Sequence, residues 1–470
     1  MQFVLSTVPV LAILLAMTVS GLHRAPVFLL ALAPMGMLAA VNLPGVGGLS
    51  ILAIDLAVVV LFAMLLSRPG GGGDMVQTFA PRGIGLALLA FLAWAALATV
   101  FFPRVFAGET EVFSIGRVAN SIGIVVRPLL PGAGNLSQLM RMALSVAAFV
   151  AVAALVRRRP DPDLILTAMT VATAVHVVMG VADVVTNWAG LEWLLSWART
   201  ANYSLTLGQR MAGLNRMIGG FPEASAYGYL SVGLFGFWLS WWFSGQGRGR
   251  WPAFWTLATA AVVLRSTSSS AYVGAAALIC VFAIHHILAV RDGTVDRRTA
   301  AIITAVLAVL PLLVVGSVVA YALSPAIADF VDRILLDKLS SSSGTERMSW
   351  NRQALVNLRD TWMLGAGLGS VRASNWVAAT LGTTGIVGLA LYVAFLVRLF
   401  AARVADPQNA ALTLALKFGC AGLLLRALVV KATPNLEIVF FVVAGCVAAL
   451  CVPARDTAAV PRLPAGVGGR

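Results

Sequence analysis

Residues 84–102 have the sequence IGLALLAFLAWAALATVFF, a predominantly apolar stretch that contains no charged side chain. About 20 such residues are needed for a helix that crosses the hydrocarbon core of a bilayer. Similar runs recur along the chain, and their continuity excludes a transmembrane β-barrel, whose strands alternate in shorter segments. The stretch therefore predicts a polytopic helical membrane protein.

The composition of the whole chain favours the same class. Of 470 residues, 60% are hydrophobic and only 11% are charged, whereas soluble domains contain about 25% charged residues. These proportions exclude a soluble enzyme, a disordered protein and a secreted disulfide scaffold. The four cysteines show no CxxC spacing, so we expect them to be small buried hydrophobic residues.

The apolar runs predict an all-α fold with about 13 transmembrane helices, within a range of about 12–14. We expect a single transmembrane domain over residues 1–453 and a disordered cytoplasmic tail over residues 454–470. No cleavage site follows the first run, so we interpret it as a span. The predicted spans are 3–20, 26–44, 48–67, 84–102, 138–156, 163–186, 223–244, 252–266, 270–290, 300–323, 376–400, 409–430 and 437–453.

Arginines in the short loops predict the orientation, because such loops stay in the cytoplasm. With Arg24, Arg68 and Arg157–Arg159 inside, the N-terminus lies outside, and so do three long loops that are also rich in arginine: 103–137, 187–222 and 324–375. Their arginines either contact lipid phosphates and acidic residues or bind an anionic substrate, since the planar guanidinium suits phosphate. The net charge of +14 thus indicates anionic lipids or an anionic substrate as partners, and no nucleic acid.

Two polar segments at span ends are candidates for chemistry. Glu223 follows Pro222 at an expected helix start, a few residues after Arg216. Its carboxylate either complements the helix dipole or acts as a general base in a partly apolar cavity. Arg265 precedes a hydroxyl cluster at 266–270, which either caps the next helix or contacts sugar or phosphate oxygens. An arginine between two spans is costly unless it is paired or solvated.

The loop 324–375 contains a predicted amphipathic helix at 346–362. Leu355, Leu358 and Trp362 share its apolar face, while Arg352 and Arg359 share another. The helix either packs as a lid with solvated arginines or lies on the membrane surface over a cavity.

Glycine-rich segments follow that helix. Gly365–Ser370, before Arg372, is not a dinucleotide motif, because its spacing differs and no strand precedes it. Its backbone N–H groups could still face an anion. The later segment Gly382–Gly388 predicts close helix packing.

Four ionisable residues fall inside predicted spans. We expect Asp55 or Asp183 to pair with Lys417 or Arg426, as a structural tie or as part of an ion path. The four histidines lie outside the outer loops, and the sequence contains no HExxH motif and no cysteine–histidine set. We therefore expect no metal and no cofactor.

Taken together, four of these places resemble the O-antigen ligase and polymerase superfamily of bacterial surface polysaccharide assembly, in its Wzy-type polymerase branch. Arg127-Pro with Gly134–Gln138 resembles a segment that precedes a span. The segment from Arg216 to Glu223 resembles the family's entry to a span, and the segment from Arg265 to Ser269 resembles its serine-rich turn. Its long outer loop and following helix resemble residues 344–388.

The resemblance implies a C-type glycosyltransferase of the bacterial inner membrane that acts at the periplasmic face. Its donor would be an undecaprenyl-pyrophosphate-linked glycan, with neither nucleotide sugar nor metal, and a chain-length regulator would be a further partner. We expect Glu223 to orient or activate the acceptor hydroxyl. We expect Arg265 to be the second catalytic residue, in contact with pyrophosphate or glycan. The residues expected to bind pyrophosphate or glycan are Arg127, Arg216, Arg347, Arg352 and Arg372.

One departure from the family pattern bears on the reaction. In the ligases a histidine precedes the asparagine that follows the long loop, but this chain has Ala373-Ser374-Asn375. The difference favours a polymerase, in which the acceptor is another lipid-linked repeat unit. Two alternatives remain: a ligase that transfers glycan to lipid A-core, and a transporter of lipid-linked glycan, which broken helices at the bilayer midplane would favour.

Overall fold

Helices dominate the fold in the computed structural model, which describes residues 1–291 and 342–452 with breaks at 46–47, 82, 119–120, 204, 207, 209, 212–213 and 248. Between these two parts it describes only residues 304, 315–316, 318–325, 327–328 and 332. The predicted span 300–323 is therefore largely, and the predicted tail 454–470 wholly, outside the described residues.

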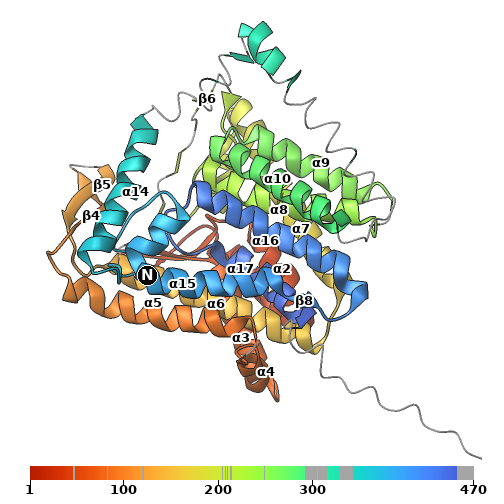
Figure 1. The fold of residues 1–470 in the computed structure, drawn as a ribbon, viewed down its shortest axis with the longest axis horizontal. Coiled ribbons are helices and arrows are strands. Elements are labelled where there is room, and N and C mark those ends of the chain that lie inside the picture. The colour runs from red at the N-terminus through yellow and green to blue at the C-terminus, as the bar shows by residue number, and fades with distance from the viewer. Residues whose placement is uncertain are drawn as a thin grey trace, which may run out of the picture.

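Six helices in the described part are long and apolar enough to cross a membrane, which confirms an all-α, multi-pass membrane protein. Figure 1 shows long helices running side by side. The six are α5 (Gly85–Val105), α6 (Ala133–Arg158), α7 (Pro162–Trp188), α10 (Ser269–Arg291), α15 (Trp376–Ala401) and α16 (Ala410–Val429).

Shorter helices take the place of several predicted spans. Among them, α3 (Ala53–Leu66) bends by 113° into α4 (Gly71–Gln77), and this pair would make a seventh crossing if it is one span. The count over the described residues is thus below the predicted 12–14. The other shorter helices are α1 (Thr7–Ser20), α2 (Ala25–Leu32), α9 (Trp251–Arg265) and α17 (Glu437–Leu450). Helix α8 (Ala224–Ser244) has 21 residues but is not among the six.

The predicted span 26–44 is wrong. Helix α2 ends at Leu32, and strand β2 (Ala39–Leu43) follows, pairing with β1 (Gln2–Phe3) and β3 (Leu49–Leu52) in one small sheet. Pro34 explains the break, because its nitrogen carries no hydrogen and cannot donate a helical hydrogen bond. Gly36 then passes so close to Phe221 that an added Cβ would lie 2.7 Å from the ring.

The loop 103–137 contains a β-hairpin that the sequence analysis did not predict. Its strands β4 (Glu111–Val118) and β5 (Ser121–Pro128) pair antiparallel, with Val112 opposite Arg127. At one end of the bundle the hairpin lies beside helix α14 (Ser342–Asp360) (Figure 1). Two further short pairings complete the strands among the described residues: β6 (Arg210–Met211) with β7 (Leu214–Asn215), and β8 (Arg403–Val404) with β9 (Cys451–Val452).

Helix α14 confirms the predicted helix in the loop 324–375, but its buried face differs from the predicted one. Of the three residues predicted to share the apolar face, only Leu358 is buried, whereas Leu355 and Trp362 are 50% and 80% exposed. The side-chain amide of Asn357 donates to Thr110 Oγ1 at 2.8 Å and to the carbonyl of Glu111. These polar contacts turn Asn357 inward, so Leu355 and Trp362 face outward.

The glycine-rich segment Gly365–Ser370 fills a break in helix α15. At Gly385 the backbone leaves the helical conformation, with φ 67°. The carbonyl oxygens freed there accept hydrogen bonds from Ala366 N and Gly367 N at 2.9 and 2.8 Å and from the Trp94 indole at 2.7 Å. Because the N–H groups of Ala366 and Gly367 already donate within the fold, they are not available to an anion. The segment packs closely against the break in α15.

Candidate functional site

A cavity of about 500 Å³ lies where the N-terminal ends of α3, α6, α8, α15 and α17 meet the C-terminal end of α16. Helix N-termini carry partial positive charge and unsatisfied N–H groups, so their convergence favours an anionic ligand. The ionisable side chains that line the cavity are Asp55, Arg141, Tyr203, Glu223, Tyr229, Arg347, Arg372, Arg426, Lys431 and Glu437.

Four arginines and one glutamate form an electrostatic group that we call the arginine cluster: Arg216, Arg347, Arg372, Arg426 and Glu223. The charge of Glu223 acts on Arg216, Arg372 and Arg426, and the charge of Arg347 acts on the same three arginines. The charge of Glu346 also acts on Arg372, but two carboxylates cannot balance four guanidinium groups. The cluster therefore leaves an excess of positive charge at the cavity, which an anion would compensate.

Different elements hold the members of the arginine cluster. Glu223 is the N-cap residue of α8, where its carboxylate accepts a hydrogen bond from the Ser225 hydroxyl. Arg426, in the last turn of α16, is 1% exposed and donates to the Ser225 carbonyl at 2.8 Å. Arg372 stacks its guanidinium over the ring of Trp350 from α14, at 4.6 Å from the ring centre.

Burial affects the two cluster arginines that lie in loops. It lowers the pKa of Arg216 and of Arg372 below the usual value for arginine, and the negative charge of Glu223 acts in the opposite direction. Arginine nevertheless remains charged in proteins. Both side chains are thus permanent cations whose hydration is reduced, so each would interact strongly with a phosphate group.

Three N–H groups of the cavity-lining residues are buried without a hydrogen-bond acceptor among the described residues. They are Nε of Arg372, Nε of Arg426 and the indole Nε1 of Trp350. A buried donor left unsatisfied costs about 1–3 kcal/mol. A ligand rich in acceptor atoms that drew these side chains toward the cavity would remove that cost.

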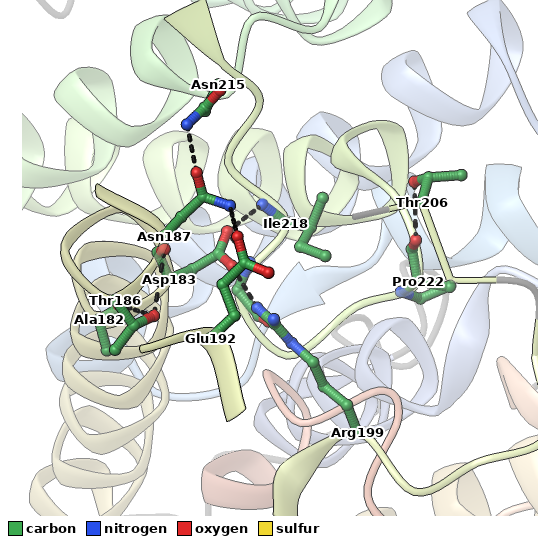
Figure 2. Close-up of polar contacts among 11 residues, drawn as sticks. Ala182, Asp183, Thr186, Asn187, Glu192, Arg199, Thr206, Asn215, Ile218 and Pro222 are labelled. Atoms are coloured by element: carbon green, nitrogen blue, oxygen red, sulfur yellow. Dashed lines mark hydrogen bonds and ion pairs between the residues drawn. The ribbon is translucent and has the colours of Figure 1, made fainter. Parts of the chain in front are cut away.

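A buried network fixes the loop that leads into α8 (Figure 2). Asp183 of α7 forms an ion pair with Arg199 and accepts hydrogen bonds from the backbone N–H groups of Ile218 and Gly219 at 2.7 and 3.2 Å. Arg199 Nε donates to the Gly219 carbonyl at 3.1 Å. These contacts hold the segment between Arg216 and Glu223 in place.

The expected pairings of the intramembrane ions are wrong. Asp183 pairs with Arg199, and Lys417 donates to the carbonyls of Phe400 and Ala402 at the end of α15. Asp55 accepts a hydrogen bond from Leu52 N at 3.0 Å and so caps α3. Backbone groups could not be foreseen as partners, because every segment of the chain offers them.

The structure brings together most of the predicted site residues. Glu223, Arg347 and Arg372 line the cavity, and Arg216 lies beside them. Arg265, at the end of α9, donates to the carbonyl of Asn215 at 2.8 Å. It therefore supports the residue next to Arg216 and does not line the cavity.

Arg127 and Arg352 lie outside the cavity, contrary to expectation. Arg127 is an exposed residue of strand β5. Arg352 is exposed on α14, because Arg347 and Trp350 point to the cavity and a residue two or five positions further along lies on another face.

A second group of lining residues was missed, and we call it the balanced group: Asp55, Arg141, Tyr203, Lys431 and Glu437. Arg141 donates to the Tyr203 hydroxyl, and its charge acts on Asp55 and Glu437. Lys431 forms an ion pair with Glu437 and lies over the ring of Tyr229 at 4.8 Å. The charged loop 431–437 between two apolar runs was the available signal in the sequence.

The sequence matches no family model, and no curated protein matches it.

Proposed function

We propose that this protein is a glycosyltransferase that polymerises undecaprenyl-pyrophosphate-linked oligosaccharide repeat units at the periplasmic face of the bacterial inner membrane. The observation that carries the proposal is the arginine cluster. The positive charge of its four arginines exceeds the negative charge of Glu223 and Glu346, and N–H groups beside it lack acceptors among the residues that the structure describes. A pyrophosphate supplies both the negative charge and the acceptor oxygens that the cluster lacks.

In the proposed reaction a hydroxyl of the acceptor glycan attacks the anomeric carbon of the donor glycan. The bond from that carbon to the pyrophosphate oxygen breaks, and the lipid pyrophosphate leaves with the electron pair. Negative charge grows on the leaving oxygen, where the fixed guanidinium groups of Arg347 and Arg372 stabilise it. The carboxylate of Glu223 takes the proton of the attacking hydroxyl.

The side of the membrane follows from the arginine-rich short loops, which belong in the cytoplasm. With that orientation, the helix ends around the cavity face the periplasm. A lipid-linked substrate would then keep its polyprenyl chain in the bilayer while its pyrophosphate enters the cavity from the outer leaflet.

Two observations favour the polymerase over its alternatives. Where the ligases have a histidine, Ser374 donates its N–H to the Asn351 side chain at 2.7 Å, and Asn375 caps α15. Broken helices would favour a transporter, and α15 is broken at Gly385. In α15 the carbonyls of Gly382, Thr383 and Thr384 at the break already accept hydrogen bonds from Ala366, Gly367 and Trp94.

The test is a reconstitution of the purified chain with undecaprenyl-pyrophosphate repeat units extracted from the source cells, in the presence of EDTA and without nucleotide. We expect a ladder of products on a gel from the wild type and from Arg352→Ala, and none from Arg347→Ala. Transfer only after lipid A-core is added would establish the ligase. Movement of the lipid across vesicles without a new glycosidic bond would establish the transporter.

A further inference from the structure

The balanced group differs from the arginine cluster in its net charge. Asp55 and Glu437 supply two carboxylates, and Arg141 and Lys431 supply two cations, with Tyr203 as a neutral hydroxyl. Burial raises the pKa of Tyr203, so its hydroxyl keeps its proton and can donate. Such a surface gives little net attraction to an anion, but it offers acceptors and donors to a ligand that carries hydroxyl groups.

Glu437 is the most unusual member of the balanced group. Its φ is 67°, a left-handed conformation that is uncommon for a residue other than glycine. Its backbone N–H donates to Asn435 Oδ1 at 2.9 Å, and that oxygen also accepts a hydrogen bond from Ser145 at 3.1 Å. Strained backbone of this kind persists where the surroundings enforce it, and it is concentrated at functional sites.

The strained backbone presents the side chain of Glu437 to the cavity. The side chain is 53% exposed, although its neighbours Leu436 and Ile438 are buried. Its ion pair with Lys431 restricts the carboxylate to one direction. A carboxylate held in this way is preorganised to accept hydrogen bonds from a ligand, which lowers the entropic cost of binding.

The two groups adjoin at Tyr229. The ring of Tyr229 lies under Lys431, and its hydroxyl interacts electrostatically with Arg426 of the arginine cluster. The Tyr229 hydroxyl also donates to the carbonyl of Leu436 at 2.6 Å, next to Glu437. A ligand on the balanced group would therefore sit beside whatever occupies the arginine cluster.

We infer that the balanced group binds an uncharged sugar residue, namely the hydroxyl-bearing end of the acceptor glycan. The inference rests on the proposed function, because only a transfer reaction needs an acceptor beside the pyrophosphate. Hydroxyl groups of the sugar donate to Glu437 and accept from the Tyr203 hydroxyl.

The test measures binding of two probes to the full-length protein in detergent by calorimetry: the neutral repeat-unit oligosaccharide released from its lipid pyrophosphate, and inorganic pyrophosphate. We expect Glu437→Gln to weaken oligosaccharide binding at least tenfold and to leave pyrophosphate binding unchanged. Arg347→Ala should show the reverse pattern. The control is Glu109→Gln, since Glu109 is an exposed glutamate outside the cavity.

A second variant guards against misfolding by Glu437→Gln. Tyr203→Phe removes only a hydroxyl, and we expect it to weaken oligosaccharide binding several-fold without a change in the unfolding temperature. Equal binding of the neutral oligosaccharide to the wild type and to both variants would overturn the inference. If both probes bind as expected but the wild type forms no product ladder in the reconstitution, the proposed function is refuted and the binding inference is not.

Discussion

Two buried arginines, Arg199 and Arg426, differ in their partners, and the difference distinguishes a structural arginine from one that is available to a ligand. Arg199 has 4% of its side chain exposed and forms an ion pair with Asp183 (Figure 2). Arg426 is equally buried, at 1% exposure, but its hydrogen bonds go to backbone carbonyls and its Nε has no acceptor among the described residues. A charge paired within the fold ties elements together, whereas a charge without a carboxylate partner leaves capacity for a ligand.

The largest effect is expected where the paired charge is broken. Asp183→Ala leaves Arg199 buried without its carboxylate and removes the acceptor of the Ile218 and Gly219 N–H groups. The free energy of unfolding should fall by about 3–5 kcal/mol. Thermal unfolding in detergent measures the loss. An unchanged unfolding temperature would show that the network does not tie the loop to α7.

The next effect concerns catalysis, with little change in stability. Arg372→Ala should lower turnover by about 10²–10³-fold, because a fixed positive charge at the leaving group is removed. Polymer yield per unit of folded protein measures it. The matched control, Arg352→Ala, removes an arginine that is exposed outside the cavity. Equal losses in the two variants would refute the distinction between cavity and surface arginines.

A smaller effect distinguishes the two buried arginines directly. Arg426→Met breaks no direct ion pair among the described residues, but it removes a donor to the carbonyls of Ser225 and Val430. We expect the free energy of unfolding to fall by about 1–3 kcal/mol, which is less than for a broken buried ion pair. Arg199→Met leaves the buried carboxylate of Asp183 without its ion-pair partner and should be strongly destabilising. The two unfolding temperatures, measured side by side, check this. Similar destabilisation by both substitutions would erase the difference between the two sites.

The smallest effect belongs to an ion pair at the protein surface. Asp161 caps α7 and contacts His23 at 2.9 Å, and the hydrogen bond from Leu164 N together with His23 lowers the pKa of Asp161. Its contribution to stability is therefore present above the unfolded pKa of about 3.9 and is lost as the pH falls through the lower folded pKa. In Asp161→Asn, the loss of unfolding free energy on acidification should be smaller than in the wild type by less than about 1 kcal/mol. Unfolding temperatures between about pH 5 and pH 2 measure it, and identical curves would contradict it.

Hydrophobic runs made much of the fold predictable, because a long apolar stretch has few alternatives to a membrane helix. The segment 26–44 failed because a buried strand and a buried helix have the same apolar composition. Only the turn at Pro34 and Gly36 distinguishes them, and the packing of Gly36 on Phe221 depends on a residue distant in sequence.

The candidate site was predictable where charge and position coincided. Glu223 was identified at the start of a predicted span, and Arg347 and Arg372 were identified in the outer loop 324–375. Arg352 was misplaced because the orientation of α14 depends on the contacts of Asn357 with Thr110 and Glu111, which periodicity cannot reveal. Glu437 was missed because nothing in its local sequence signals a positive φ.

The most direct measurement for the central account is the shift in unfolding temperature caused by undecaprenyl pyrophosphate. This ligand should stabilise the wild type and Arg352→Ala equally, since binding to the folded state alone raises its stability. It should not stabilise the double variant Arg347→Ala/Arg372→Ala. An equal shift in that double variant would contradict the assignment of the arginine cluster as the pyrophosphate site.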